Sequence, residues 1–202
     1  MKIKLLLVSV LLSLWVAVWP AHADATVTDD VKKVVDEVLR IVSNKEMKKP
    51  QNEEKRRASL EKAIGSIFDY GQMAKLSMGT HWKERTPPEQ KEFEQLFETL
   101  LENTYATKIE AYNNDKIVYV RENVDGNHAE VKSRVITAKG EEYSLNYQLS
   151  KEGNEWKVHD VVIEGVSLVA NYRGQFNRII QTQGYDDLVK KLRTKNAAIK
   201  AP

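Results

Sequence analysis

The sequence predicts an α+β fold in a single domain, because the hydrophobic period changes twice along its 202 residues. Apolar residues recur at helical spacing up to about Asn113, alternate from there to about Glu164, and return to helical spacing from Ser167. Turn signals containing glycine divide the alternating part into four strands with short connections, which is typical of an antiparallel meander. We therefore expect helices, then a four-stranded sheet, then helices.

Six helices are expected, each marked by apolar residues three and four positions apart. The clearest start is that of the fourth helix, where Thr86 and Glu89 make a capping box and Pro87 occupies the first helical position. This helix should run to about Ala111. The last helix should span residues 186 to about 195. The six apolar stripes cover residues 31–42, 60–68, 73–78, 93–105, 168–180 and 188–192.

The four expected strands share short turns and one dry face. In the third strand, apolar and polar residues alternate from Tyr143 to Leu149. The second strand alternates in the same way from Ala129 to Thr137. A sheet with one wet face needs helices over its dry face. The strands span residues 116–123, 128–137, 142–150 and 155–164.

The first 23 residues have the composition of a secretory signal peptide. Two lysines precede an apolar run over residues 5–18, and Ala21, His22 and Ala23 offer small residues for cleavage. The alternative is a membrane anchor, but a bilayer-spanning helix needs about 20 apolar residues and this run is shorter. We expect cleavage after Ala23, a folded domain over residues 24–196 and a flexible tail over residues 197–202.

Composition argues against several classes of function. The formal charge of +2 falls to zero once the two lysines of the signal peptide are removed, so the mature chain lacks the basic footprint of nucleic-acid binding proteins. The absence of cysteine excludes disulfides, thiolate metal sites and cysteine nucleophiles. A mature chain of about 180 residues is long enough to form a core without disulfides.

The sequence offers few groups for catalysis. None of the four histidines has a second metal ligand at the spacings of known motifs, and no nucleophile elbow or phosphate-binding glycine loop is present. Asp160 is the one candidate general base, because it interrupts an apolar run where burial would raise its pKa. The more ordinary interpretation is an aspartate that anchors a loop at a strand bulge. We expect no enzyme activity, no metal and no cofactor.

A segment at the end of the sheet resembles a signature of the MlaC family, the soluble component of bacterial systems that maintain outer-membrane lipid asymmetry. Further matches in chain order are residues 73–79, the helix start at Thr86 and Pro87, and residues 184–188. The most specific part is the block from Gly165 to Arg173. The residues that carry the signature are Trp156, Asp160, Gly165, Val166, Ser167, Leu168, Tyr172, Arg173 and Phe176.

The resemblance implies a periplasmic phospholipid-binding protein. It further implies exchange of lipid with two partners, an inner-membrane ABC transporter complex and an outer-membrane lipoprotein complex. The implied fold is a curved antiparallel sheet wrapped by helices, with acyl chains inserted between them. Two acyl chains hold on the order of 30 methylenes at about 0.8 kcal/mol each, so their escape into water costs on the order of 20 kcal/mol. A carrier therefore needs an apolar cavity of several hundred Å³ or more.

Our candidates for the lining of this cavity share a place on the predicted dry faces, although core packing is the alternative for each of them. Tyr172 suits a cavity mouth, and Arg173 would meet either a lipid phosphate or a carboxylate of the protein. Headgroups left in solvent would make binding tolerant of several headgroups. The candidates are Phe93, Leu96, Phe97, Leu100, Val120, Val131, Val135, Leu145, Tyr147, Val161, Ile163, Val166, Leu168, Val169, Tyr172 and Phe176.

Two other functions stay open from the residues. One is an enzyme of α+β cone fold that uses Asp160 as a base on a small apolar substrate. The other is an interaction domain or periplasmic chaperone with a filled core and no ligand. An apolar cavity with bound phospholipid as its cargo separates the carrier from both.

Overall fold

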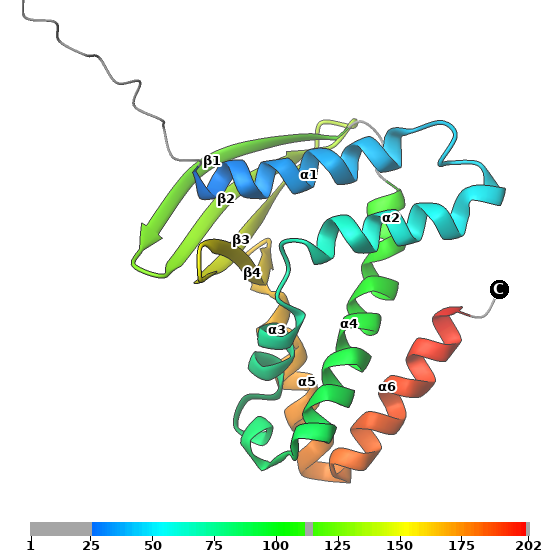
Figure 1. Cartoon of the computed structure of the whole chain (residues 1–202), viewed down its shortest axis with the longest axis vertical. Coiled ribbons are helices and arrows are strands. Elements are labelled where there is room, and N and C mark those ends of the chain that lie inside the picture. Colours follow the sequence, from blue (N-terminus) through cyan, green and yellow to red (C-terminus); the bar gives the residue numbers. More distant parts are fainter. Residues whose placement is uncertain (1–25, 112–114, 201–202) are drawn as a thin grey trace, which may run out of the picture.

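The computed structural model of the chain describes residues 26–111 and 115–200 (Figure 1). The expected signal peptide lies outside these residues. Six α-helices, two short 3₁₀ helices and one antiparallel sheet make up the described part, which confirms the α+β prediction. The elements are α1 (Val27–Ser43), η1 (Pro50–Asn52), α2 (Glu53–Gly65), α3 (Tyr70–Met78), η2 (Gly79–Glu84), α4 (Pro87–Glu110), β1 (Lys116–Asp125), β2 (His128–Ile136), β3 (Glu142–Glu152), β4 (Glu155–Ile163), β5 (Val166–Ser167), α5 (Leu168–Gln183) and α6 (Tyr185–Lys200).

The sheet has five strands in the order β1-β2-β3-β4-β5, one more than the four expected. The additional strand arises because Glu164 and Gly165 take positive φ angles of 49° and 77°, which turns the chain back on itself. Val166 then pairs with Ile163, and Ser167 pairs with Val162. A strand of two residues leaves no alternation in the sequence, so the periodicity did not reveal it.

Two bulges interrupt the ladders. In the β1–β2 ladder the register shifts between Tyr119 and Arg121 of β1. In the β3–β4 ladder it shifts between Gln148 and Leu149, where His159 of β4 is the extra residue. A bulge bends its strand and increases the local twist. In Figure 1 the long strands curve past α1, which lies across their inner face.

The N-terminal half of α1 covers the dry face of the sheet. Thr26 caps the helix in a capping box with Asp29, and Glu122 of β1 accepts hydrogen bonds from the backbone nitrogen and the hydroxyl of Thr28 at 2.7 and 2.6 Å. These contacts dock the start of the helix onto the sheet. The buried residues that pack at this end are Val27, Val31, Ile67, Ala129, Val131, Tyr147, Leu149, Val158 and Val161.

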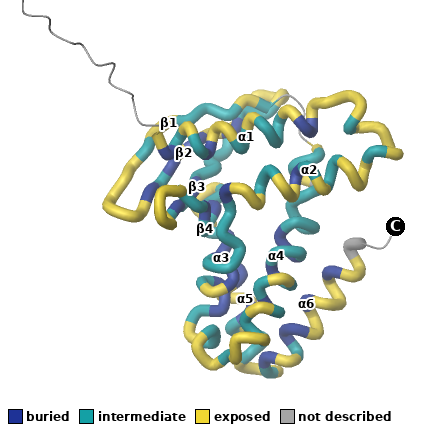
Figure 2. The backbone as a smooth tube through the Cα atoms, in the orientation of Figure 1, coloured by how far each residue is buried: buried dark blue, intermediate teal, exposed yellow. Residues whose placement is uncertain are grey.

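Helices α3, α4, α5 and α6 form a lobe below the sheet with its own core (Figures 1 and 2). Phe97 lies at the centre of this core and contacts Tyr172 and Phe176 edge-on, at centroid distances of 5.2 and 5.7 Å. The link from sheet to lobe is backbone pairing, because the Asp69 nitrogen donates to the Val158 oxygen at 2.9 Å. Val158 in turn donates to the oxygen of Ile67 at 2.7 Å.

α6 continues to Lys200, beyond the end expected near residue 195. Residues 197–200 are therefore helical. Asn196 is buried and its side-chain amide donates to the oxygen of Leu96 at 2.9 Å, which fastens the end of α6 to α4. This contact joins residues 100 positions apart, so local sequence patterns do not reveal it.

Candidate functional site

An apolar cavity of about 520 Å³ lies between the sheet and the helices α1, α2 and α4. Protein interiors are normally packed to the density of organic crystals, with few voids larger than a water molecule. A space of this volume is therefore a specific feature of the fold and not a packing defect.

The first two helices form one wall of the cavity. The stripe of α1 that faces the sheet continues past Val31 as a row of residues at helical spacing. α2 lies beside it and adds two aliphatic side chains. The apolar residues of this wall are Val34, Val35, Val38, Leu39, Leu60 and Ile64.

The inner face of the sheet forms the opposite wall. Because every second residue of a strand points to the same face, the lining residues form three rows across the strands. In each row the residues are direct neighbours in the antiparallel ladder. The rows are Ile117, Val135 and Tyr143; then Leu145 and Ile163; then Tyr147 and Val161.

The floor of the cavity is the top of the helical lobe. Met73, Leu101 and Leu168 line the cavity and also belong to the core of the lobe. They separate the empty space from the aromatic cluster around Phe97. α4 continues along the side of the cavity with Tyr105, Ala106 and Ile109.

Charged side chains mark the place where the cavity meets solvent. Arg57 and Glu61 of α2 line it together with Lys108 of α4 and Asp115 before β1. Glu61 and Lys108 are exposed, so the cavity reaches the surface between these two helices. The ammonium of Lys108 lies 5.3 Å from the centroid of the Tyr105 ring. The opening thus carries both signs of charge.

The other polar residues of the wall are Glu102, Asn103 and four tyrosines, whose hydroxyls stay neutral. Burial raises the pKa of Tyr105, Tyr143 and Tyr147 above the ordinary value. Burial also raises the pKa of Tyr70, and the carboxylates of Glu102, Glu98 and Glu61 raise it further. At physiological pH the four phenols are hydrogen-bond donors without charge.

Six of the candidate lining residues border the cavity, and the other ten do not. The six are Val135, Leu145, Tyr147, Val161, Ile163 and Leu168. Seven others pack in the helical lobe: Phe93, Leu96, Phe97, Leu100, Val169, Tyr172 and Phe176. Val131 is buried between α1 and the sheet. Val120 and Val166 are exposed to 55% and 58%.

Each difference has a physical reason. The aromatic side chains of α4 and α5 stack on one another and fill the lobe, so Tyr172 lies in a core and not at the cavity mouth. Val120 is the extra residue of the β1 bulge, which removes it from the alternation of that strand. Arg173 is exposed, and its aliphatic stem lies against Gly79.

The wall formed by α1 and α2 was not among the candidates. The signal for it was present, because the stripe from Val31 to Val42 is a strong helical pattern. That stripe has two parts with different surroundings. Val31 packs against the sheet, whereas Val34, Val35 and Val38 border empty space. Nothing in the periodicity separates the two parts.

Asp160 anchors the loop that leads from β4 into α5. Its carboxylate accepts hydrogen bonds from the backbone nitrogens of Val161 and Val169 at 2.8 and 3.0 Å, and from the hydroxyl of Ser167. Ser167 in turn caps α5 by accepting from the nitrogen of Ala170. The Asp160 side chain lies next to the bulge at His159 and holds the start of α5. This arrangement agrees with the interpretation of Asp160 as a loop anchor at a strand bulge.

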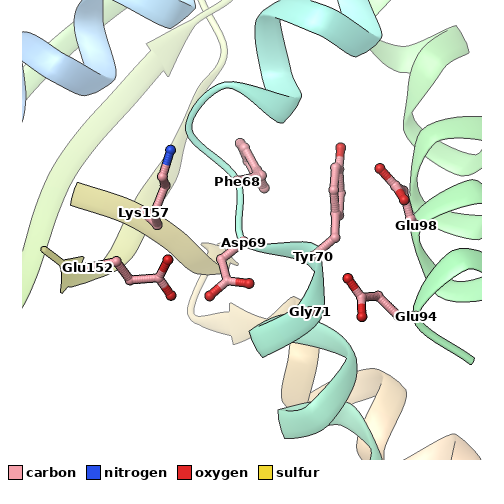
Figure 3. A pocket seen from close by; sticks show the side chains of 8 residues that line it. All are labelled: Phe68, Asp69, Tyr70, Gly71, Glu94, Glu98, Glu152 and Lys157. Carbon is pink, nitrogen blue, oxygen red and sulfur yellow. The ribbon is translucent and has the colours of Figure 1, made fainter. Parts of the chain in front are cut away.

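A second pocket of about 270 Å³ has the opposite character (Figure 3). Phe68 and Tyr70 border both this pocket and the apolar cavity, and they stack at a centroid distance of 6.0 Å. Burial raises the pKa of Glu98, and a hydrogen bond with Asp69 raises that of Glu152. Carboxylates make this pocket a poor site for hydrocarbon.

Within residues 26–111 and 115–200, the histidines, aspartates and glutamates form no group of three or more that would hold a metal ion. Across the same ranges, none of the helices is both long enough and apolar enough to cross a bilayer.

Comparison with curated proteins identifies relatives over part of their length. The toluene tolerance protein ttg2D of Pseudomonas putida is 30% identical over 130 residues, which is 63% of this chain and 60% of that protein. The intermembrane phospholipid transport system binding protein MlaC of Haemophilus influenzae is 31% identical over 120 residues, 57% of this chain and 56% of that protein. The chain thus matches less than two thirds of the length of these relatives.

A solved structure and a family model extend the match. The structure, described as the phospholipid-binding protein of Ralstonia solanacearum in complex with a phospholipid, has a TM-score of 0.79 and 29% identity. It covers 88% of this chain and 100% of that chain. A family model described as MlaC protein matches residues 32–194. Since this match includes every helix and strand that borders the cavity, the chain belongs to the MlaC family.

Proposed function

We propose that the chain is a periplasmic carrier that holds a phospholipid by its acyl chains in the apolar cavity. It exchanges this cargo with an outer-membrane lipoprotein complex and an inner-membrane ABC transporter complex. The observation that carries the proposal is the cavity of about 520 Å³ with aliphatic and aromatic walls. Bound phospholipid is its cargo and not a cofactor.

The volume of the cavity is also close to that of an acyl chain. A protein cavity of about 150 Å³ binds benzene, so about 520 Å³ holds on the order of 20 carbon atoms. That number exceeds one acyl chain of ordinary length and is smaller than the 30 or so methylenes of two chains. A two-chain lipid therefore needs the walls to move apart, or leaves part of a chain at the opening between α2 and α4.

Two relatives support the proposed cargo and its transport between membranes. The Ralstonia protein, which resembles this chain over its whole fold, is described as being in complex with a phospholipid. The Haemophilus relative is named as the binding protein of an intermembrane phospholipid transport system. The signal peptide expected over residues 1–23 agrees with export of the protein to the periplasm, between the two membranes.

The chain acts as a carrier and not as an enzyme in this proposal. The carboxylate of Asp160, the one candidate base, accepts hydrogen bonds from Val161, Ser167 and Val169, and the residue does not border the cavity. A general base must lie within hydrogen-bond reach of the proton that it takes. The side chains that do border the cavity near its opening are neutral phenols and ion-forming residues of both signs.

The decisive experiment is native mass spectrometry of the protein purified without added lipid, paired with organic extraction of the same sample. A carrier retains a mass that matches phospholipid, and the extract contains fatty-acyl material. Protein that retains no such mass, and stays empty after incubation with phospholipid vesicles, contradicts the proposal. Transfer of labelled lipid between vesicles that hold each membrane complex then tests the two partners.

A further inference from the structure

Tyr147 places a polar group in the wall of the apolar cavity. Its side chain is 7% exposed and stands on β3 between Val131 of β2 and Val161 of β4. No hydrogen bond between described residues involves its hydroxyl, and burial raises its pKa. A hydroxyl in an apolar wall is stabilised when it gains a hydrogen-bond partner, and native structures satisfy nearly all such groups. The hydroxyl is therefore placed to meet something that enters the cavity.

Two further tyrosines stand next to it on the same face of the sheet. Tyr143 lines the cavity on the same strand. Tyr119 of β1 is opposite Ser133, which is opposite Leu145, so Tyr119 belongs to the row between Tyr143 and Tyr147. It packs against the core between α1 and the sheet and does not itself line the cavity. Within residues 26–111 and 115–200, the buried Tyr119 hydroxyl also finds no partner.

The three phenols are close enough to influence one another. Tyr119 and Tyr143 both raise the pKa of Tyr147 beyond the effect of its burial. Carboxylates stand behind two of them, since Asp36 of α1 raises the pKa of Tyr119 and Asp115 raises that of Tyr143. The hydroxyls thus stay protonated and are available as donors.

We infer that the hydroxyls of Tyr143 and Tyr147, which both line the cavity, form a polar subsite that donates hydrogen bonds to the ester carbonyls of the bound lipid. This inference rests on the proposed function and adds a recognition element to it. An ester carbonyl is the acceptor that a diacyl lipid carries where each chain begins. A neutral phenol suits this uncharged acceptor, whereas a phosphate is held by arginine or lysine.

The subsite makes the chemical linkage of the chains a determinant of affinity. A site built to hydrogen-bond a ligand discriminates against an analogue that lacks the bonding atom, because its own polar groups then stay unpaired. A dialkyl ether phospholipid has the same headgroup and chains as the diacyl ester but no carbonyls. It fills the cavity and leaves the hydroxyls of Tyr143 and Tyr147 without an acceptor.

The test measures competition between diacyl and dialkyl phosphatidylglycerol with identical chains, for the delipidated wild-type protein and for Tyr147→Phe. We expect the wild type to prefer the ester by about tenfold, which corresponds to about 1.4 kcal/mol. Tyr147→Phe keeps the ring and should bring the ratio close to one. Tyr172→Phe is the matched control, because Tyr172 lies in the core of the helical lobe and does not border the cavity.

Each outcome is informative. Equal binding of ester and ether by the wild type overturns the subsite but leaves the carrier function intact. An ester preference that survives in Tyr147→Phe and in Tyr143→Phe also overturns it. Binding of neither lipid contradicts the proposed function itself. Palmitate serves as a third competitor, and its displacement of the ester at lower concentration than the ether would assign the hydroxyls to a free carboxylate instead.

Discussion

Arg56 and Glu110 form an ion pair that ties α2 to the end of α4 beside the cavity, with 3.0 Å between Nε and Oε1. Their side chains are only 11% and 22% exposed. Arg56 also donates from Nη1 to the oxygen of Met47 at 2.6 Å, so one guanidinium holds the α1–α2 connection, α2 and α4 together. The pair spans the two helices between which the cavity reaches solvent.

Breaking this ion pair should destabilise the protein. Glu110→Gln leaves the Arg56 charge partly buried without its carboxylate, which we expect to lower the free energy of unfolding by about 1 to 2 kcal/mol. Urea denaturation followed by circular dichroism measures it. Glu37→Gln breaks the exposed pair with Arg40 and serves as the control, for which no measurable change is expected. Equal effects of the two substitutions would contradict the structural role.

Filling the cavity should displace cargo. Val135 borders the cavity on β2, and Val135→Phe projects a larger side chain into that space. We expect the purified variant to retain at most a few tenths of the phospholipid found in the wild type. Val120→Phe is the same substitution at an exposed position of the neighbouring strand and should retain lipid normally. Phosphate analysis of organic extracts measures both, and equal retention in the two variants argues against this cavity as the binding site.

Truncation should distinguish cavity walls from packed core. Leu100 is fully buried in the helical lobe, so Leu100→Ala should cost about 2 to 5 kcal/mol of stability. Leu145 faces the cavity and has fewer packing partners to lose. Leu145→Ala should therefore lower the free energy of unfolding of the lipid-free protein by only about 1 to 2 kcal/mol. Chemical denaturation compares them. A cost at Leu145 as large as that at Leu100 would indicate a filled interior and favour a domain without ligand.

Removing the Asp160 carboxylate should affect stability and spare lipid binding. Asp160→Ala deletes three accepted hydrogen bonds at the start of α5, and we expect a loss of about 2 to 3 kcal/mol. Asp36→Ala, at an exposed position of α1, is the control and should change little. Lipid retention measured at low temperature should match the wild type. Loss of an activity on a small substrate, with stability unchanged, would instead support the enzyme alternative.

The acidic pocket should make stability depend on pH. Burial raises the pKa of Glu98 above its ordinary value of 4.5, and Glu94 and Glu61 raise it further. An acid whose pKa is higher in the folded state binds its proton more tightly there, so folding loses stability as pH rises from 4.5 through the folded-state pKa. Glu98→Gln should therefore raise the melting temperature at pH 7 and leave it nearly unchanged at pH 4. A rise of the same size at both pH values contradicts this assignment.

Local features were predictable from the sequence because their causes are local. Thr86 and Glu89 pair at the start of α4 as the sequence predicts, and the nitrogen and hydroxyl of Thr86 both donate to the Glu89 carboxylate at 2.7 Å, which is the glutamate half of a capping box. The alternation from Tyr143 to Leu149 correctly marks the dry face of β3. A capping box needs four consecutive residues and a strand face needs only the two-residue period. Both are complete within the sequence that forms them.

The cavity was decided by the tertiary structure. Phe97 and Leu145 are both apolar and both on predicted dry faces, yet Phe97 is packed among aromatic rings and Leu145 borders open space. Periodicity reports which side of an element avoids water, and this preference is satisfied equally by a neighbouring side chain and by a dry cavity. The sequence by itself therefore determined the elements, their order and their apolar faces. Where those faces meet and where they stand apart depends on bulges, long-range hydrogen bonds and the volumes of side chains from distant segments.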